Sequence, residues 1–266
     1  MSTDQTNTSA DFYYRIPVRE GEEKPSFGKN SIDPAIVRHQ PHKKKVTSAR
    51  NLHTTLDNEG FVLAQHESHI KNFYDKKEIE KTYYPEMKAL ARQVTGAKSF
   101  RVLGHITRNE AEAEPGKRLG AHRLVHSDFT PSLIHRIREF VPNPELTQGR
   151  VAIFNIWRRF DLGHTDAPLA VCDSRSISPE DLLPTDLHNY GGRNGFELEI
   201  YQSLYSDRHR WFYYPEMEIN EVMIFRTLDS DMDPFVPTLH SAFDHPNCPE
   251  DAPPRESIET RVLCFY

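Results

Sequence analysis

The stretch Arg123–Pro131 reads RLVHSDFTP, and the rest of the chain is interpreted around it. Residues i and i+2 of a β-strand point to the same side, so His126 and Asp128 would face one way. An imidazole and a carboxylate placed like this can both reach one metal ion. They make up two-thirds of a 2-His-1-carboxylate facial triad, the arrangement that binds non-haem Fe(II) and leaves coordination positions open.

The third ligand of such a triad must be a distant histidine that the fold brings close. The best candidate is His240, in the segment PTLHSAF at 237–243. His245 lies nearby, and spacing alone does not exclude it. The HxD pair is weakly specific on its own, because the chain contains 14 histidines. A strand-end histidine that is hydrogen-bonded to its neighbour is the alternative interpretation.

A second pattern lies near the C-terminus, where Arg255 and Ser257 face the same side of a predicted strand. An oxygenase that uses 2-oxoglutarate needs a cation for the far carboxylate of that cosubstrate. Arginine suits this role because its planar fork pairs with a carboxylate through two parallel hydrogen bonds. Arg261 has the same parity and is a second candidate. The alternative for each arginine is a surface ion pair with Glu256 or Glu259.

Composition limits the classes of protein that the chain can belong to. A formal net charge of −6 argues against a general nucleic-acid binder. No run of about 18 apolar residues is present, so no membrane span is expected. Met1–Ala10 lacks the features of a secretory signal. The dispersed cysteines Cys172, Cys248 and Cys264 predict reduced thiols in a cytoplasmic protein.

Short apolar or alternating runs predict strands through most of the chain, and helical spacing is found at Lys77–Gln93 and Pro131–Phe140. Residues 184–195 are expected to form a loop, and the basic run His42–Val46 a solvated surface. We therefore expect a mainly β (α+β) fold with flanking helices and a double-stranded β-helix, jelly-roll or cupin-like core. The chain is expected to be one domain, with a helical N-terminal extension over 1–98 and the core with its metal site over 99–266.

Three further residues are candidates for shaping a substrate pocket: Trp157, Arg158 and Trp211. Aromatic residues on strands more often belong to the core, which is the alternative for both tryptophans. Arg158 lies on a strongly predicted strand, where a charge needs a partner. Asp173 or the substrate is the partner expected for it.

Several longer strings occur in order along the chain: VHSDFT (125–130), NIWR (155–158), PLAVCDSRS (168–176), HRWFYYPEM (209–217) and RESIETR (255–261). From about residue 100 onward, the chain resembles the asaB-type hydroxylase/desaturase family, which includes secondary-metabolite oxygenases of the CmcJ and NvfI kind. The resemblance implies a jelly-roll oxygenase in which His126, Asp128 and His240 bind Fe(II) and 2-oxoglutarate is the cosubstrate. Arg159-Phe160 departs from the expected pattern, which has a proline after NIWR.

The function expected from these features is hydroxylation or desaturation of a small-molecule natural product, with O₂ as the second substrate. Two other classes stay open at this point. The barrel could hold Zn(II) and act as a hydrolase or isomerase, or it could bind a small molecule without catalysis. An exposed N-terminal segment could support a homodimer, and no C-terminal lid is expected because the chain stops at Tyr266.

Overall fold

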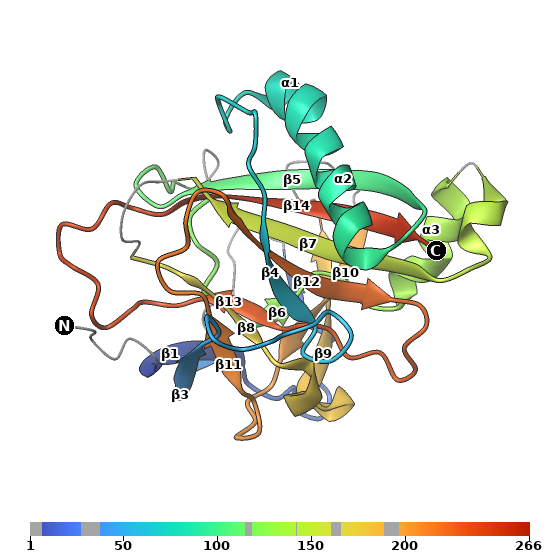
Figure 1. Cartoon of the computed structure of the whole chain (residues 1–266). Coiled ribbons are helices and arrows are strands. Elements are labelled where there is room, and N and C mark those ends of the chain that lie inside the picture. Colours follow the sequence, from blue (N-terminus) through green and yellow to red (C-terminus); the bar gives the residue numbers. More distant parts are fainter. Residues whose placement is uncertain (1–6, 28–37, 115–118, 142, 161–165, 189–196) are drawn as a thin grey trace.

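The computed structural model describes residues 7–27, 38–114, 119–141, 143–160, 166–188 and 197–266. The framework of the described chain is two β-sheets that face each other (Figure 1). The larger, nine-stranded sheet has the order β1 (Asn7–Arg15), β3 (His39–Ser48), β11 (Trp211–Tyr213), β8 (Leu169–Cys172), β13 (His240–Ala242), β6 (His126–Ser127), β10 (Glu197–Ser203), β9 (Leu182–His188) and β2 (Ser26–Phe27).

The second sheet has five strands, and its outer face is covered by helix (Figure 1). Two apolar clusters join the inner faces of the two sheets, one around Phe61 and Leu169 and the other around Phe129 and Leu263. This layered arrangement is the expected double-stranded β-helix, or jelly roll, with flanking helices. The order of the five strands is β4 (Phe61–Gln65), β12 (Glu221–Asp229), β7 (Val151–Arg159), β14 (Glu256–Phe265) and β5 (Ser99–Asn109).

The covering helix runs through three segments: α1 (Lys76–Glu78), the π-helical Ile79–Tyr83 and α2 (Tyr84–Thr95). Pro85 has no N–H to bond the carbonyl four residues earlier, which explains why the helix widens just before it. The helix ends at Gly96, whose φ of 69° is left-handed and favours glycine. Met87 and Leu90 on its buried face pack against the outer face of the five-stranded sheet.

The nine-stranded sheet curls so that its first strand returns to the segment before His126. Val125 N donates to Tyr13 O (3.0 Å), and Tyr13 forms a parallel bridge with Leu124. The space enclosed by this curl is filled by an apolar cluster that includes Phe12 and Trp211, with ring centroids 4.3 Å apart. The second helix of note, α3 (Ser132–Phe140), follows the His126 segment and closes one end of the sandwich.

Three expectations about this fold need correction. The proposed division at residue 99 does not describe the sheets, because β1, β2, β3 and β4 all precede it and belong to the two sheets. The basic run His42–Val46 is part of β3, with Lys43 and Lys45 exposed and Lys44 and Val46 buried. Residues 182–188 form β9, whereas a loop was expected from 184, and 189–195 lie outside the described residues. Within the described part, no helix is long and apolar enough to cross a membrane.

Candidate active site

The two candidate histidine ligands lie on neighbouring strands of the nine-stranded sheet. His126 begins β6, His240 begins β13, and the two residues are direct partners in the antiparallel pairing. Their ring centroids are 4.2 Å apart. Asp128 follows β6 immediately, and its Oδ1 is 3.8 Å from His126 Nε2. One ligand atom from each of the three residues lies within 4.8 Å of the others, and all three residues are buried.

Hydrogen bonds to backbone carbonyls set the proton position on both imidazoles. His126 Nδ1 donates to Leu124 O (2.8 Å), and His240 Nδ1 is directed at Thr238 O (3.4 Å). A carbonyl only accepts, so each Nδ1 carries the proton and each Nε2 keeps its lone pair. Burial lowers the pKa of His126 to about 3 and that of His240 to about 4, so both rings are neutral and able to bind a metal.

Asp128 is oriented by two donors on the facing sheet. Asn155 Nδ2 (2.6 Å) and Arg261 Nε (2.7 Å) both donate to its Oδ2, which leaves Oδ1 on the histidine side. Burial alone would raise the pKa of Asp128, but the charge of the Arg261 guanidinium and its hydrogen bond to the carboxylate hold it well below its usual range. The side chain is therefore a carboxylate of fixed orientation. Thr227 Oγ1 in turn donates to Asn155 Oδ1 (3.2 Å).

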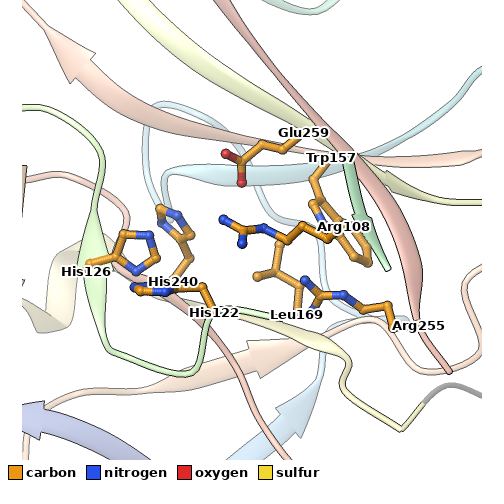
Figure 2. A pocket seen from close by; sticks show the side chains of 8 residues that line it. All are labelled: Arg108, His122, His126, Trp157, Leu169, His240, Arg255 and Glu259. Carbon is orange, nitrogen blue, oxygen red and sulfur yellow. The ribbon is translucent and has the colours of Figure 1, made fainter. Parts of the chain in front are cut away.

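A small pocket opens beside the ligands (Figure 2). Along β14, the residues that face the interior change from apolar Phe265 and Leu263 to polar Arg261, Glu259 and Ser257, so the pocket wall is polar on this side. The side chains that line the pocket come from both sheets and from the segment before β6: Arg108, His122, His126, Trp157, Leu169, His240, Arg255 and Glu259.

Arg255 is 2% exposed and reaches this pocket from the residue before β14. Its Nη1 donates to Ala167 O (2.7 Å), and its guanidinium carbon lies 5.6 Å from the centroid of the Trp157 ring. Arg255 Nε and Ser257 Oγ are buried without a hydrogen-bond partner in the described part of the chain. Burial lowers the pKa of Arg255 to about 9. A buried cation beside an unsatisfied hydroxyl is the chemistry that a carboxylate ligand would satisfy.

The other candidates have different surroundings. Arg261 donates hydrogen bonds to Asp128 and to Glu259 (Nη2 to Oε1, 2.8 Å), so its side chain is directed at a candidate metal ligand. His245, the competitor of His240, has its Nε2 3.4 Å from Tyr213 Oη and does not line the pocket.

Of the three substrate-pocket candidates, only Trp157 lines the pocket. Arg158 points to the opposite face of β7, where its Nη2 donates to His66 O (2.9 Å) and lies 2.8 Å from His66 Nδ1. His66, and neither Asp173 nor a substrate, is therefore its partner. Trp211 is in the cluster enclosed by the curled sheet, where its Nε1 donates to Tyr14 Oη (2.8 Å).

Four polar residues of the site were not identified from the sequence: Arg108, His122, Asn155 and Glu259. Strand parity could have indicated two of them. Glu259 alternates with Ser257 and Arg261 on the last strand, and Asn155 alternates with Trp157. His122 lies before the HxD stretch in a segment without periodic pattern, and its ring centroid is 4.4 Å from that of His126.

Two imidazoles and a carboxylate in the interior of a jelly roll define the class of facial-triad, non-haem iron oxygenases. Comparison with known proteins agrees with this class. A family model described as "Oxidoreductase/YMDC permease-like domain" matches residues 4–265. The Fe(II)/2-oxoglutarate-dependent dioxygenase nvfI of Aspergillus novofumigatus is 31% identical over 262 residues, which cover 97% of this chain and 92% of the relative.

Two further comparisons place the chain within this class. The hydroxylase/desaturase efuI of Hormonema carpetanum is 29% identical over 237 residues, which cover 80% of this chain and 79% of the relative. A solved structure of the iron and alpha-ketoglutarate-dependent endoperoxidase NvfI superposes with a TM-score of 0.85 at 28% identity, over 98% of this chain and 99% of that one. The chain belongs to the asaB-type hydroxylase/desaturase family of Fe(II)/2-oxoglutarate-dependent oxygenases. A zinc hydrolase and a non-catalytic binding barrel are not favoured.

Proposed function

We propose that this protein is a non-haem Fe(II)/2-oxoglutarate-dependent oxygenase that hydroxylates or desaturates a small-molecule natural product. The observation that carries the proposal is one pocket with two parts. A buried donor set of two neutral imidazoles and a carboxylate faces a buried arginine that no carboxylate pairs with in the described chain. The names of the relatives, a dioxygenase and a hydroxylase/desaturase among them, support the same chemistry.

Each part of the pocket has a role in this proposal. His126, Asp128 and His240 would hold Fe(II), and Arg255 with Ser257 would hold the far carboxylate of 2-oxoglutarate. When bound, the iron and 2-oxoglutarate supply the oxidising chemistry that activates O₂ and removes hydrogen from a substrate C–H bond.

The surrounding residues hold these groups in place and limit the access of water. Asn155 and Arg261 fix the orientation of Asp128, so that one oxygen stays on the metal side. Trp157 packs over the Arg255 guanidinium, and together with Leu169 it gives the pocket an apolar wall. An apolar wall keeps bulk water from the reacting centre, where it would otherwise compete for reactive species.

The experiment is an anaerobic titration of the purified protein with Fe(II) and 2-oxoglutarate, followed by visible absorption. A weak metal-to-ligand charge-transfer band is expected for 2-oxoglutarate chelated to a facial-triad iron. Asp128→Asn should remove the band. Asp229→Asn is the matched control, because Asp229 is also a buried aspartate paired with an arginine, Arg150, but lies outside the pocket. Absence of the band from the unsubstituted protein would reject the proposal.

We also propose a cytoplasmic location and a homodimer. Three free cysteines support a reducing compartment. The N-terminal segment was the expected dimer contact, but from Asn7 onward it forms β1 and pairs with β3 of the same chain. The expected contact is therefore an edge strand of the nine-stranded sheet and not a separate N-terminal arm. Light scattering of the purified protein measures the mass and tests this prediction.

A further inference from the structure

The pocket contains a second arginine, which the proposed binding of iron and 2-oxoglutarate does not use. Arg108 lies near the end of β5, opposite Ser257 of β14, and its side chain lines the pocket. In Figure 2, the guanidinium groups of Arg108 and Arg255 both point toward the side of the pocket where the three imidazoles lie. The pocket therefore offers two separate cations to a ligand.

Arg108 forms no ion pair in the described part of the chain, and Glu259 acts on it only at longer range. Its Nη1 donates to Gly120 O (2.9 Å), a neutral carbonyl, and no carboxylate of the described chain is within ion-pair distance. The nearby acids already have partners. Glu110 pairs with Arg123 (2.7 Å), and Glu259 pairs with Arg261. A guanidinium with one neutral partner in a partly enclosed site has donors left for an anionic ligand.

The charges around the metal site lead to the same conclusion. Asp128 and Glu259 share the single cation Arg261. Burial and the charge of Asp128 raise the pKa of Glu259, and protonation of Glu259 removes a negative charge, so this trio carries at most one net negative charge. Arg108 and Arg255 add two positive charges, which leaves at least one net positive charge in the wall of the pocket. Bound Fe(II) and 2-oxoglutarate, with charges of opposite sign and equal size, do not change this balance. An uncompensated charge in a site with little water is costly, and a substrate anion would remove that cost.

We propose that the primary substrate carries a carboxylate or an equivalent anionic group close to the carbon that reacts, and that Arg108 binds this group. The inference rests on the proposed oxygenase function and makes it more specific. Arg255 serves the cosubstrate and Arg108 the substrate, so Arg108 determines specificity for acids over their neutral analogues. The cosubstrate's own metal-binding carboxylate is the competing ligand for Arg108, and the experiment separates the two.

The test uses the anaerobic Fe(II) protein loaded with 2-oxoglutarate, and two probes of equal shape, phenylacetate and phenylacetamide. Binding is followed by the shift of the charge-transfer band and by tryptophan fluorescence. Trp157 lines the pocket, whereas the other tryptophan, Trp211, is buried elsewhere and gives a constant background. The variant is Arg108→Met. The matched control is Arg101→Met, on the same strand but exposed.

The unsubstituted protein and Arg101→Met should bind phenylacetate at least tenfold more tightly than phenylacetamide. Loss of a charge-assisted contact should weaken phenylacetate binding to Arg108→Met by about tenfold or more and leave phenylacetamide unchanged. The affinity for 2-oxoglutarate should stay within about threefold of the original in Arg108→Met and fall at least tenfold in Arg255→Met.

Two results would overturn the inference. One is an equal preference for acid and amide, or no binding of the acid, in a protein that shows the charge-transfer band. The other is a loss of 2-oxoglutarate affinity in Arg108→Met as large as in Arg255→Met, which would assign Arg108 to the cosubstrate. A missing band in the unsubstituted protein would instead reject the oxygenase function itself, so the two failures are distinguishable.

Discussion

Removal of the Asn155 amide tests how the orientation of Asp128 controls metal binding. Asn155→Ala deletes the 2.6 Å hydrogen bond to Asp128 Oδ2 and leaves the Arg261 bond to the same oxygen. A hydrogen bond to a charged group contributes about 1.5–3 kcal/mol, and loss of a group that orients a metal ligand lowers affinity by about 10–100-fold. Because Arg261 still holds Asp128, we expect the lower end, about tenfold weaker binding of the metal.

Mn(II) binding, measured by electron paramagnetic resonance, gives the affinity without oxidation of the metal, and urea unfolding gives the stability. The control is Asn109→Ala. Asn109 is also a buried asparagine whose Nδ2 donates to a carboxylate, Glu256 (3.0 Å), but it has no contact with the three metal ligands. Both variants should lose about 1–3 kcal/mol of unfolding free energy, and only Asn155→Ala should lose metal affinity. Equal Mn(II) affinity in the two variants would refute the reasoning.

Three further predictions concern residues around the site. Arg158→Met should lower the free energy of unfolding by about 2 kcal/mol because its bonds to His66 are lost, while anaerobic titration should find 2-oxoglutarate affinity unchanged; a loss of that affinity would contradict the placement of Arg158. Burial lowers the pKa of His209 to about 4, so below about pH 6.5 the unfolded chain takes up a proton that the folded protein does not. Stability therefore falls as the pH drops through this range, and thermal melts at pH 7 and pH 5 should show a smaller fall for His209→Gln than for the unsubstituted protein. Gly60→Ala adds a Cβ that overlaps Ser174 Oγ and Thr238 Oγ1 at a φ of +87°. It should destabilise the protein by clearly more than the roughly 1 kcal/mol expected of the control Gly96→Ala, where nothing lies within 4 Å of the added Cβ. Equal melting temperatures for the two variants would contradict this prediction.

Strand alternation placed His126 and Asp128 correctly relative to each other, but it did not show which face of β7 looks into the pocket. Trp157 and Arg158 are neighbours and must point in opposite directions. On a strand with one solvent-exposed face, the charged residue would point to the solvent. Every residue of β7 is buried, because one face lies under helix α2 and the other faces the nine-stranded sheet. Polarity along the strand therefore gives no direction, and Arg158 was assigned to the wrong side.

The pairing of strands that are distant in sequence was the hardest part of the fold to predict. The lysines of β3 alternate between exposed and buried positions, and the aliphatic stem of Lys44 is buried while its Nζ donates to Ser206 O (3.0 Å). The composition of this strand is that of a surface loop, and only its pairing with β1 and β11 makes it a strand. In the same way, Arg108 and Arg255 come from segments 147 residues apart in sequence, and only the neighbouring positions of β5 and β14 bring them together.

The candidate ligands of the metal and of the cosubstrate lie on different sheets, and this division has a mechanical consequence. His126 and His240 belong to the nine-stranded sheet, whereas Ser257 and the pocket arginines are on or beside strands of the five-stranded sheet. A metal chelated by one end of 2-oxoglutarate, with the other end on Arg255, would act as a removable cross-link through the middle of the sandwich. Binding of the metal and the cosubstrate would therefore stabilise the folded state. By the same linkage, a substitution that loosens the contact between the two sheets would weaken the binding of the cosubstrate.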